Sequence, residues 1–140
     1  MGGYQMSKLL GAAFAVISVA ILNGSHSFAR NAEMDAALDT QFELMRKQAP
    51  LEIDEITKLT NVMRIGPSIT YTYETKIPEA SWTPLLREAA FQRYLKVNCL
   101  GSKNARMILD HGYSVRHVIL DDQKNFVANV LITKDKCPSP

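Results

Sequence analysis

The chain contains 140 residues, of which 46% are hydrophobic and 21% are charged. Its 16 basic and 14 acidic residues give a formal net charge of +2, a near-neutral balance that argues against nucleic-acid binding and against electrostatic attachment to a membrane surface. The composition is neither rich in proline and glycine nor strongly charged, so most of the chain is expected to fold.

The first 29 residues have the three-part layout of a cleavable secretory signal peptide. A polar stretch with one positive charge at Lys8 precedes an apolar run over residues 9–22, and small residues occupy positions 27 and 29. We predict cleavage after Ala29. Residues 30–140 then form one exported domain, located in the periplasm if the source is bacterial, or secreted.

Two alternatives remain for this segment. A start at Met6 gives an equally good signal peptide, and an uncleaved anchor helix is the other possibility. The apolar run is shorter than the ~20 residues that span hydrocarbon, so no stable membrane insertion is expected after cleavage. No cysteine lies near the predicted cut to accept a lipid.

The first half of the exported domain predicts a helix followed by a β-hairpin. Residues 32–48 place apolar side chains on one helical face, at Met34, Leu38, Phe42 and Met45. Residues 51–65 change to an alternating pattern, Gly66-Pro67 is a turn signal, and residues 68–75 alternate almost perfectly.

The second half predicts two helices and another hairpin. Ser81 or Thr83 can cap a helix that ends near Gly101, and a shorter helix is expected over residues 103–110. Residues 113–120 and 126–133 then alternate on either side of a polar turn. The predicted order is α-β-β-α-α-β-β. It favours an α+β domain with one antiparallel four-stranded sheet and the helices packed on one face.

Only Cys99 and Cys137 supply thiols. An even pair in a small exported domain predicts a disulfide, which closes a loop long enough to stabilise the fold by roughly 4 kcal/mol. The alternative is a reactive thiol, but neither cysteine belongs to a Cys-x-x-Cys motif.

The sequence contains no signature of catalysis, metal binding or cofactor binding. His111 and His117 are the histidines of the exported part, and they lack nearby ligands in sequence for a zinc site. The acidic pairs at 54–55 and 121–122 are expected to be structural or solvated. A thiol enzyme would require Cys99 to be free of the disulfide.

Two groups of residues are candidates for contact with a partner. The central helices have a basic bias, from Arg87, Arg93, Lys96, Lys103 and Arg106, which indicates either a solvated face or a docking surface for an acidic partner. Aromatic residues are common at interaction hot spots, so Tyr71, Tyr73 and Trp82 predict either a contact patch or the cover of a core.

The spacing of several of these markers resembles that of small exported bacterial disulfide-bonded domains of unassigned function. The markers are the run Ile53-Asp54-Glu55-Ile56-Thr57, the Tyr71-x-Tyr73 strand, the helix leading to Cys99, Arg106-x-x-Leu109-x-x-x-Gly112, and the terminal Cys137. In size and element order the chain is more loosely similar to periplasmic pilotins, which guide secretin subunits of secretion systems. Lysozyme inhibitors and toxin-immunity proteins share its size and export.

These observations favour a non-enzymatic envelope protein that binds another protein as an accessory factor, a pilotin-like chaperone or an inhibitor. The alternative is a small hydrolase or thiol-dependent enzyme with a site assembled from scattered residues. An apolar groove would favour the binding protein, whereas a deep cleft that holds titratable residues would favour the enzyme.

Overall fold

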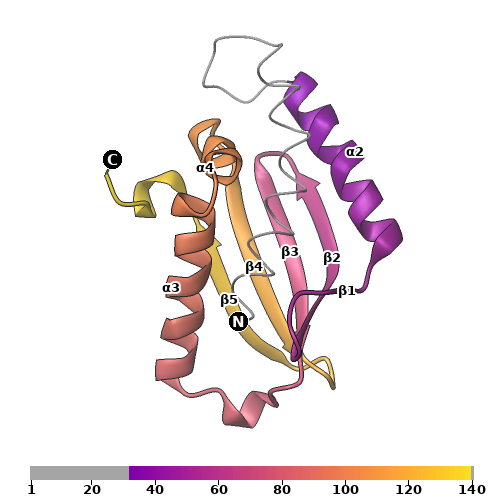
Figure 1. Ribbon diagram of the computed structural model, residues 1–140, viewed down its shortest axis with the longest axis vertical. Helices are drawn as coiled ribbons and strands as arrows, with labels where there is room; N and C mark the ends of the chain where they lie inside the picture. The colour runs from indigo at the N-terminus through magenta and orange to yellow at the C-terminus, as the bar shows by residue number, and fades with distance from the viewer. Residues whose placement is uncertain (1–31, 140) are drawn as a thin grey trace.

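The computed structural model describes residues 32–139, which form an α+β fold (Figure 1). The predicted signal peptide and its cleavage site lie outside the described residues. No helix among residues 32–139 has the length and apolar character needed to cross a bilayer. The helices are α2 (Ala32–Gln48), α3 (Pro84–Leu100) and α4 (Lys103–Asp110), and the strands are β1 (Leu51–Glu52), β2 (Thr57–Ile65), β3 (Ser68–Thr75), β4 (Ser114–Asp121) and β5 (Phe126–Ile132).

The five strands form one sheet in the order β1-β2-β3-β4-β5. Both predicted hairpins are present as antiparallel pairs, β2 with β3 and β4 with β5. The central pair is parallel, with Ser68 of β3 opposite Ser114 of β4 and Thr75 opposite Asp121. The prediction of four antiparallel strands was therefore wrong in two respects, because the sheet is mixed and β1 adds a fifth strand.

The parallel pair follows from the length of the helices between the hairpins. With 17 residues, α3 spans ~25 Å at ~1.5 Å per residue. The 8 residues of β3 span nearly the same distance at ~3.3 Å per residue. Helix α3 therefore returns the chain to the end of the sheet at which β3 begins. The second helix, α4, has 8 residues and is too short to reverse that return. Consequently β4 starts at the same end of the sheet as β3 and runs parallel to it.

The fifth strand arises from a turn between β1 and β2. The backbone N–H groups of Ile53 and Asp54 both donate to the carbonyl of Thr57, at 2.9 and 3.3 Å, and fold the chain back on itself. Leu51 and Glu52 then pair antiparallel with the beginning of β2. The brief alternation at the start of residues 51–65 is therefore a strand of its own, which the four-strand prediction did not count.

The helices begin where the sequence provides capping side chains. The Thr83 hydroxyl accepts from the backbone N–H of Leu86 at 3.2 Å, and Pro84 occupies the first turn of α3, where its missing N–H costs no helical hydrogen bond. The Ser102 hydroxyl accepts from Ala105 at 3.0 Å and starts α4. These caps agree with the predicted starts of both helices.

One face of the sheet carries the core. Alternate residues of β3 and β4 are buried on it: Ile69, Tyr71, Tyr73, Val115, His117 and Ile119. Helix α2 packs over β2 with its predicted apolar stripe, and α3 packs over β5, so the two helices lie on either side of the central strands (Figure 1). Helix packing on a single face matches the sequence-based expectation.

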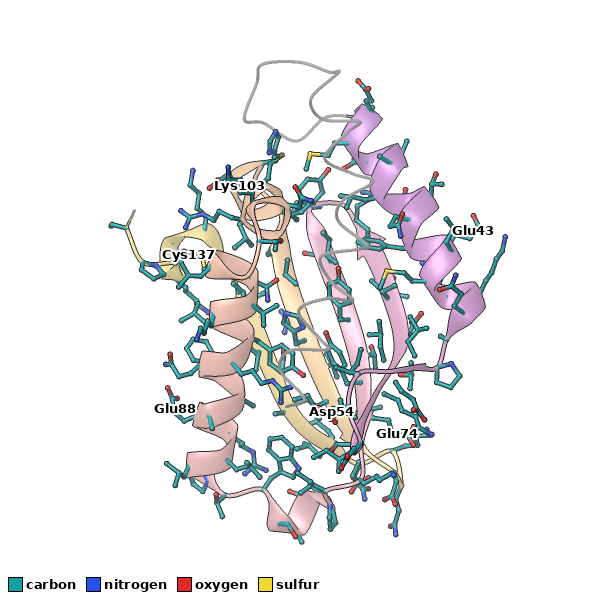
Figure 2. The ribbon with its side chains drawn as sticks, in the orientation of Figure 1. Glu43, Asp54, Glu74, Glu88, Lys103 and Cys137 are labelled. Atoms are coloured by element: carbon teal, nitrogen blue, oxygen red, sulfur yellow. A yellow bond between two sulfur atoms is a disulfide. The ribbon has the colours of Figure 1, made fainter. Side chains whose placement is uncertain are left out.

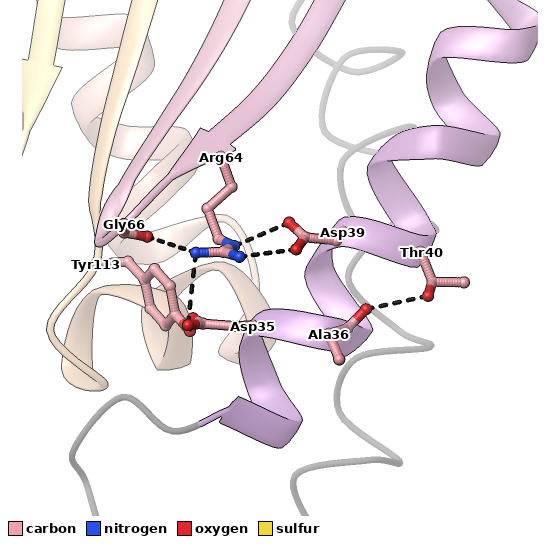
Figure 3. A network of polar contacts seen from close by, with 7 residues as sticks. All are labelled: Asp35, Ala36, Asp39, Thr40, Arg64, Gly66 and Tyr113. Carbon is pink, nitrogen blue, oxygen red and sulfur yellow. Dashed lines mark hydrogen bonds and ion pairs between the residues drawn. The ribbon is translucent and has the colours of Figure 1, made fainter.

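An arginine of β2 fastens α2 to the sheet (Figure 3). Arg64 donates through Nε and Nη2 to the two carboxylate oxygens of Asp39, at 2.9 and 2.7 Å, and through Nη1 to the carbonyl of Gly66 at 2.8 Å. A second carboxylate of α2, that of Asp35, lies 3.5 Å from Nη1 and accepts a hydrogen bond from the Tyr113 hydroxyl. The hydrogen bond to Asp39 raises the pKa of Arg64.

A buried carboxylate holds the turn between β4 and β5. Burial acts to raise the pKa of Asp121, but hydrogen bonds from the backbone N–H groups of Asn125, Glu79 and Gln123 and from the Asn125 side chain outweigh that effect and lower it. The bond to Glu79 also connects this turn to the segment that leads into α3. The acidic pair at 121–122 therefore has the structural role that was expected for it at Asp121.

Candidate apolar groove beside helix α3

A cavity of ≈200 Å³ lies between α3, the loop that joins β1 to β2, and the adjacent ends of β2, β3 and β4. Its lining is mainly apolar and includes Ile56, Ile77, Trp82, Leu86, Ala90 and Ile119. We refer to this cavity as the α3 groove. Its size is comparable to that of a cavity of ~150 Å³ that binds benzene, so it suits one large apolar side chain.

The local sequence explains why this side of α3 faces the groove. Leu86, Ala89, Ala90 and Arg93 recur at intervals of three and four residues and therefore share one helical face. Their side chains are small in the middle of the stretch, which leaves space between the helix and the sheet. Trp82 closes one end, with its indole N–H donating to the carbonyl of Ile77 at 3.3 Å.

Arg93 lines the groove and is partly exposed, so it marks the solvent-facing edge, or opening, of the groove, and it forms an ion pair there. Arg93 of α3 places Nη2 at 3.4 Å from Oδ2 of Asp54 in the β1–β2 loop, and the arginine side chain is 40% exposed. The other carboxylate oxygen of Asp54 accepts from the backbone N–H of Ile56 at 2.9 Å. Figure 2 shows Asp54 near one end of the sheet, whereas Glu88 points away from the sheet on the outer side of α3.

Stacked rings lie behind the groove. Tyr94 lines it and stacks on His117, with ring centroids 4.2 Å apart and an interplanar angle of 21°. Burial lowers the pKa of His117 to about 3, so the imidazole is neutral at physiological pH. Burial also raises the pKa of the Tyr94 hydroxyl. The groove therefore has an uncharged aromatic wall, and Arg93 is the charged side chain among the lining residues.

The predicted partner-contact residues separate into two groups. Tyr71 and Tyr73 are 0% and 1% exposed and contribute to the core, and Trp82 is 9% exposed at the end of the groove. Arg87 donates to the carbonyls of Val127, at 3.1 Å, and Trp82, and it lies 3.6 Å from a carboxylate oxygen of Glu79. Trp82 and Arg93 line the groove, while Arg87 forms hydrogen bonds that hold the segment before α3 against β5.

Sequence reasoning did not identify Asp54, Ile56 and Leu86 as parts of one site. The spacing of Leu86 and Arg93 on α3 was a usable signal, because it places both on one helical face. The approach of Asp54 to Arg93 had no such signal. It depends on the turn that separates β1 from β2 and brings the loop across the sheet.

A second hollow, of ≈410 Å³, lies near the same end of the sheet and is polar. It is lined by the acidic residues Glu52, Asp54, Glu55, Glu74 and Asp122 together with Lys58 and Lys76. All of these charged side chains are exposed or half-buried, and Glu74 pairs with Lys124. The hollow is therefore lined by charges of mixed sign that lie at or near the surface.

The cysteines form a disulfide, with Sγ atoms 2.01 Å apart and Cα atoms 5.4 Å apart. It joins the end of α3 to the tail that follows β5. Because Cys99 is bonded to Cys137, its sulfur is not a thiolate nucleophile in this state. No group of three or more His, Cys, Asp or Glu side chains within residues 32–139 is arranged to hold a metal ion.

No protein-family model matches the chain, and no curated protein matches it in sequence. Solved structures do share its fold. The type II secretion system pilotin AspS of Vibrio cholerae is 20% identical with a TM-score of 0.58, over 74% of this chain and 91% of that chain.

Two further structures have the same fold. The type 2 secretion system pilotin EpsS of Vibrio vulnificus is 13% identical with a TM-score of 0.62, over 76% of this chain and 93% of that chain. A candidate secreted protein of Pseudomonas aeruginosa is 14% identical with a TM-score of 0.60, over 82% of this chain and 100% of that chain. The fold is therefore a pilotin-like α+β fold, in agreement with the looser resemblance noted from element order.

Proposed function

We propose that this protein is an accessory factor of the bacterial cell envelope that binds a segment of another protein in the α3 groove, in the manner of a pilotin. The observation that carries the proposal is the groove itself. It is an apolar cavity with an aromatic wall at the surface, of a size that admits a side chain from a partner. The pilotin-like fold and the predicted signal peptide support the same role.

The physical basis of binding would be burial of apolar surface. An unfilled apolar cavity leaves the side chains that line it without contact partners, and a large apolar side chain from a partner supplies those contacts. A fully buried Leu, Ile or Phe side chain contributes roughly 1.5–3 kcal/mol. The groove therefore acts as an anchor point, and contacts around its opening would add the remaining affinity.

Site-specific photo-cross-linking in the native cells tests this proposal. A photoreactive amino acid at Ala89, which is exposed and lines the groove, is compared with one at Asn129, which is exposed on β5. We expect an envelope protein, identified by mass spectrometry, to cross-link at Ala89 and not at Asn129.

A second variant, Ala90→Trp, fills the groove and should abolish that adduct while leaving the protein folded and exported. Identical adducts at both positions, or none at native abundance, would contradict the proposal. An adduct that persists after the groove is filled would place the partner elsewhere on the molecule.

A further inference from the structure

Arg93 lies at the opening of the α3 groove, and its guanidinium has N–H donors that are available to a ligand. Within residues 32–139, the ion pair with Asp54 is the one polar contact of the Arg93 side chain, at 3.4 Å. That distance is longer than the ~2.7–2.9 Å of a good charge-assisted hydrogen bond. A guanidinium carries five N–H donors, so most of those of Arg93 remain available to a ligand.

The other arginines of the central helices, Arg87 and Arg106, do not line the groove. Arg87 is engaged by two backbone carbonyls and Glu79, and Arg106 donates to Asp110 within α4 at 3.1 Å. Arg93 is 40% exposed, against 39% for Arg87 and 25% for Arg106, and it lines the groove where they do not. Of the basic residues first noted in the sequence, Arg93 is therefore the one placed to meet a carboxylate at an apolar cavity.

Asp54 does not block such a contact. It is held by its own loop through the backbone N–H of Ile56. A guanidinium can also serve two carboxylates at once, as Arg64 does in this molecule with Asp39 and Asp35. Arg93 can therefore keep Asp54 on one side and accept a second carboxylate on the other.

We infer that the partner segment presents a carboxylate next to a large apolar side chain, such that the apolar side chain enters the α3 groove and the carboxylate pairs with Arg93. This inference rests on the proposed function and specifies the chemistry of the partner. Charge complementarity supports it, because the cavity is apolar and its opening carries an exposed cation that is only weakly paired.

Two small probes isolate this chemistry from the unidentified partner. N-acetyl-phenylalanine carries the carboxylate, and N-acetyl-phenylalaninamide is its neutral counterpart with the same ring. Each is titrated into the protein purified from the envelope, and shifts of the backbone amide signals of Ala90 and Ile119 report binding in the groove. We expect the carboxylate probe to bind about five- to tenfold more tightly than the amide.

Matched variants identify the group responsible. Arg93→Gln should remove the preference, whereas Lys96→Gln, an equal change of charge one turn along α3, should retain it. Asp54→Asn removes the competing carboxylate and should tighten binding of N-acetyl-phenylalanine severalfold without affecting the amide. A purely structural role of the ion pair predicts no such gain.

Equal affinity of the two probes for the unaltered protein would overturn the inference, as would equal loss of the preference in the Arg93 and Lys96 variants. So would the absence of any shift at the groove. If any of these three results were obtained but a groove-specific cross-link still formed in cells, the proposed function would stand and only the carboxylate chemistry of the partner would be rejected. If the protein preferred the carboxylate probe but no cross-link formed at Ala89, the carboxylate site would be supported and the proposed binding of a protein partner would be rejected.

Discussion

The side-chain nitrogen of Asn98 lies 2.8 Å from Nε2 of His117. An amide nitrogen only donates, and this one also donates to the carbonyl of Tyr94 at 2.7 Å, so Nε2 must accept. The hydrogen-bond network therefore assigns the imidazole proton to Nδ1, which lies 3.0 Å from the hydroxyl of Tyr73. The fold thus selects one neutral tautomer of a histidine that is 0% exposed.

Acid should destabilise the protein through His117. Its pKa is about 3 in the folded protein and 6.5 when unperturbed, so between these values the unfolded chain binds the extra proton. Stability is then complete above about pH 6.5 and declines as pH falls toward 3, by about 1.4 kcal/mol per pH unit. Urea unfolding at several pH values between 7 and 4 measures this slope.

His117→Gln is the control for that slope. The variant should be less stable at pH 7 because the buried network is altered, but its unfolding free energy should change much less between pH 6.5 and 4. An unchanged slope would refute the assignment to His117. Asp121 acts in a lower window, since its lowered pKa contributes stability above about pH 4 that is lost only below that value.

Arg64→Lys should weaken the attachment of α2 to the sheet. Lysine keeps the charge but cannot make the two parallel hydrogen bonds to Asp39 and the third to Gly66. We expect a loss of ~1–3 kcal/mol in the free energy of unfolding. Lys47→Gln removes a solvated ion pair of α2 with Glu43 and should cost less than ~0.5 kcal/mol. Similar losses in both variants would show that the Arg64 network adds nothing beyond a surface pair.

Removing the disulfide should destabilise the domain by roughly 4 kcal/mol, because the cross-link restricts an unfolded loop. The bridged cysteines are 38 residues apart. Cys99→Ser and Cys137→Ser should each have this effect, and the double variant should cost no more than the larger single loss. Chemical denaturation without reductant measures the three variants, and additive losses would be inconsistent with a shared bond.

Export and cleavage near Ala29 remain predictions of the sequence. The intact mass of protein from a cell-envelope extract should match residues 30–140, and thiol alkylation should occur only after reduction. A full-length mass with freely alkylated cysteines would contradict both export and the disulfide. The thiol-dependent enzyme would then become the leading alternative.

Local patterns predicted the helices and the two hairpins well, because spacing and capping are encoded within a few residues. Met34, Leu38 and Phe42 repeat with the helical period, and Thr83 and Ser102 cap α3 and α4. The parallel β3–β4 pair was missed because strand direction depends on the length of the intervening helices. The periodicity of the strands themselves contains no information on direction.

The site was predictable only in part, for a related reason. Arg93 was recognisable as a basic residue on a helix with an apolar face, but its pairing with Asp54 joins segments 39 residues apart. Tyr71 and Tyr73 have the composition of a contact patch, yet they point to the helix-covered face of central strands. Aromatic composition alone does not distinguish a core from a surface, whereas position in the sheet does.

The parallel pairing of β3 with β4 also determines when the core can form. Residues that face each other across this pair, such as Ser68 and Ser114, are 46 positions apart in the chain. A nascent chain that ends after β3 therefore has nothing to cover Tyr71 and Tyr73 on the β4 side, and closing so long a loop is slow. The chain should be most susceptible to proteolysis before β4 and β5 have been added. Resistance should appear when this hairpin pairs with β3.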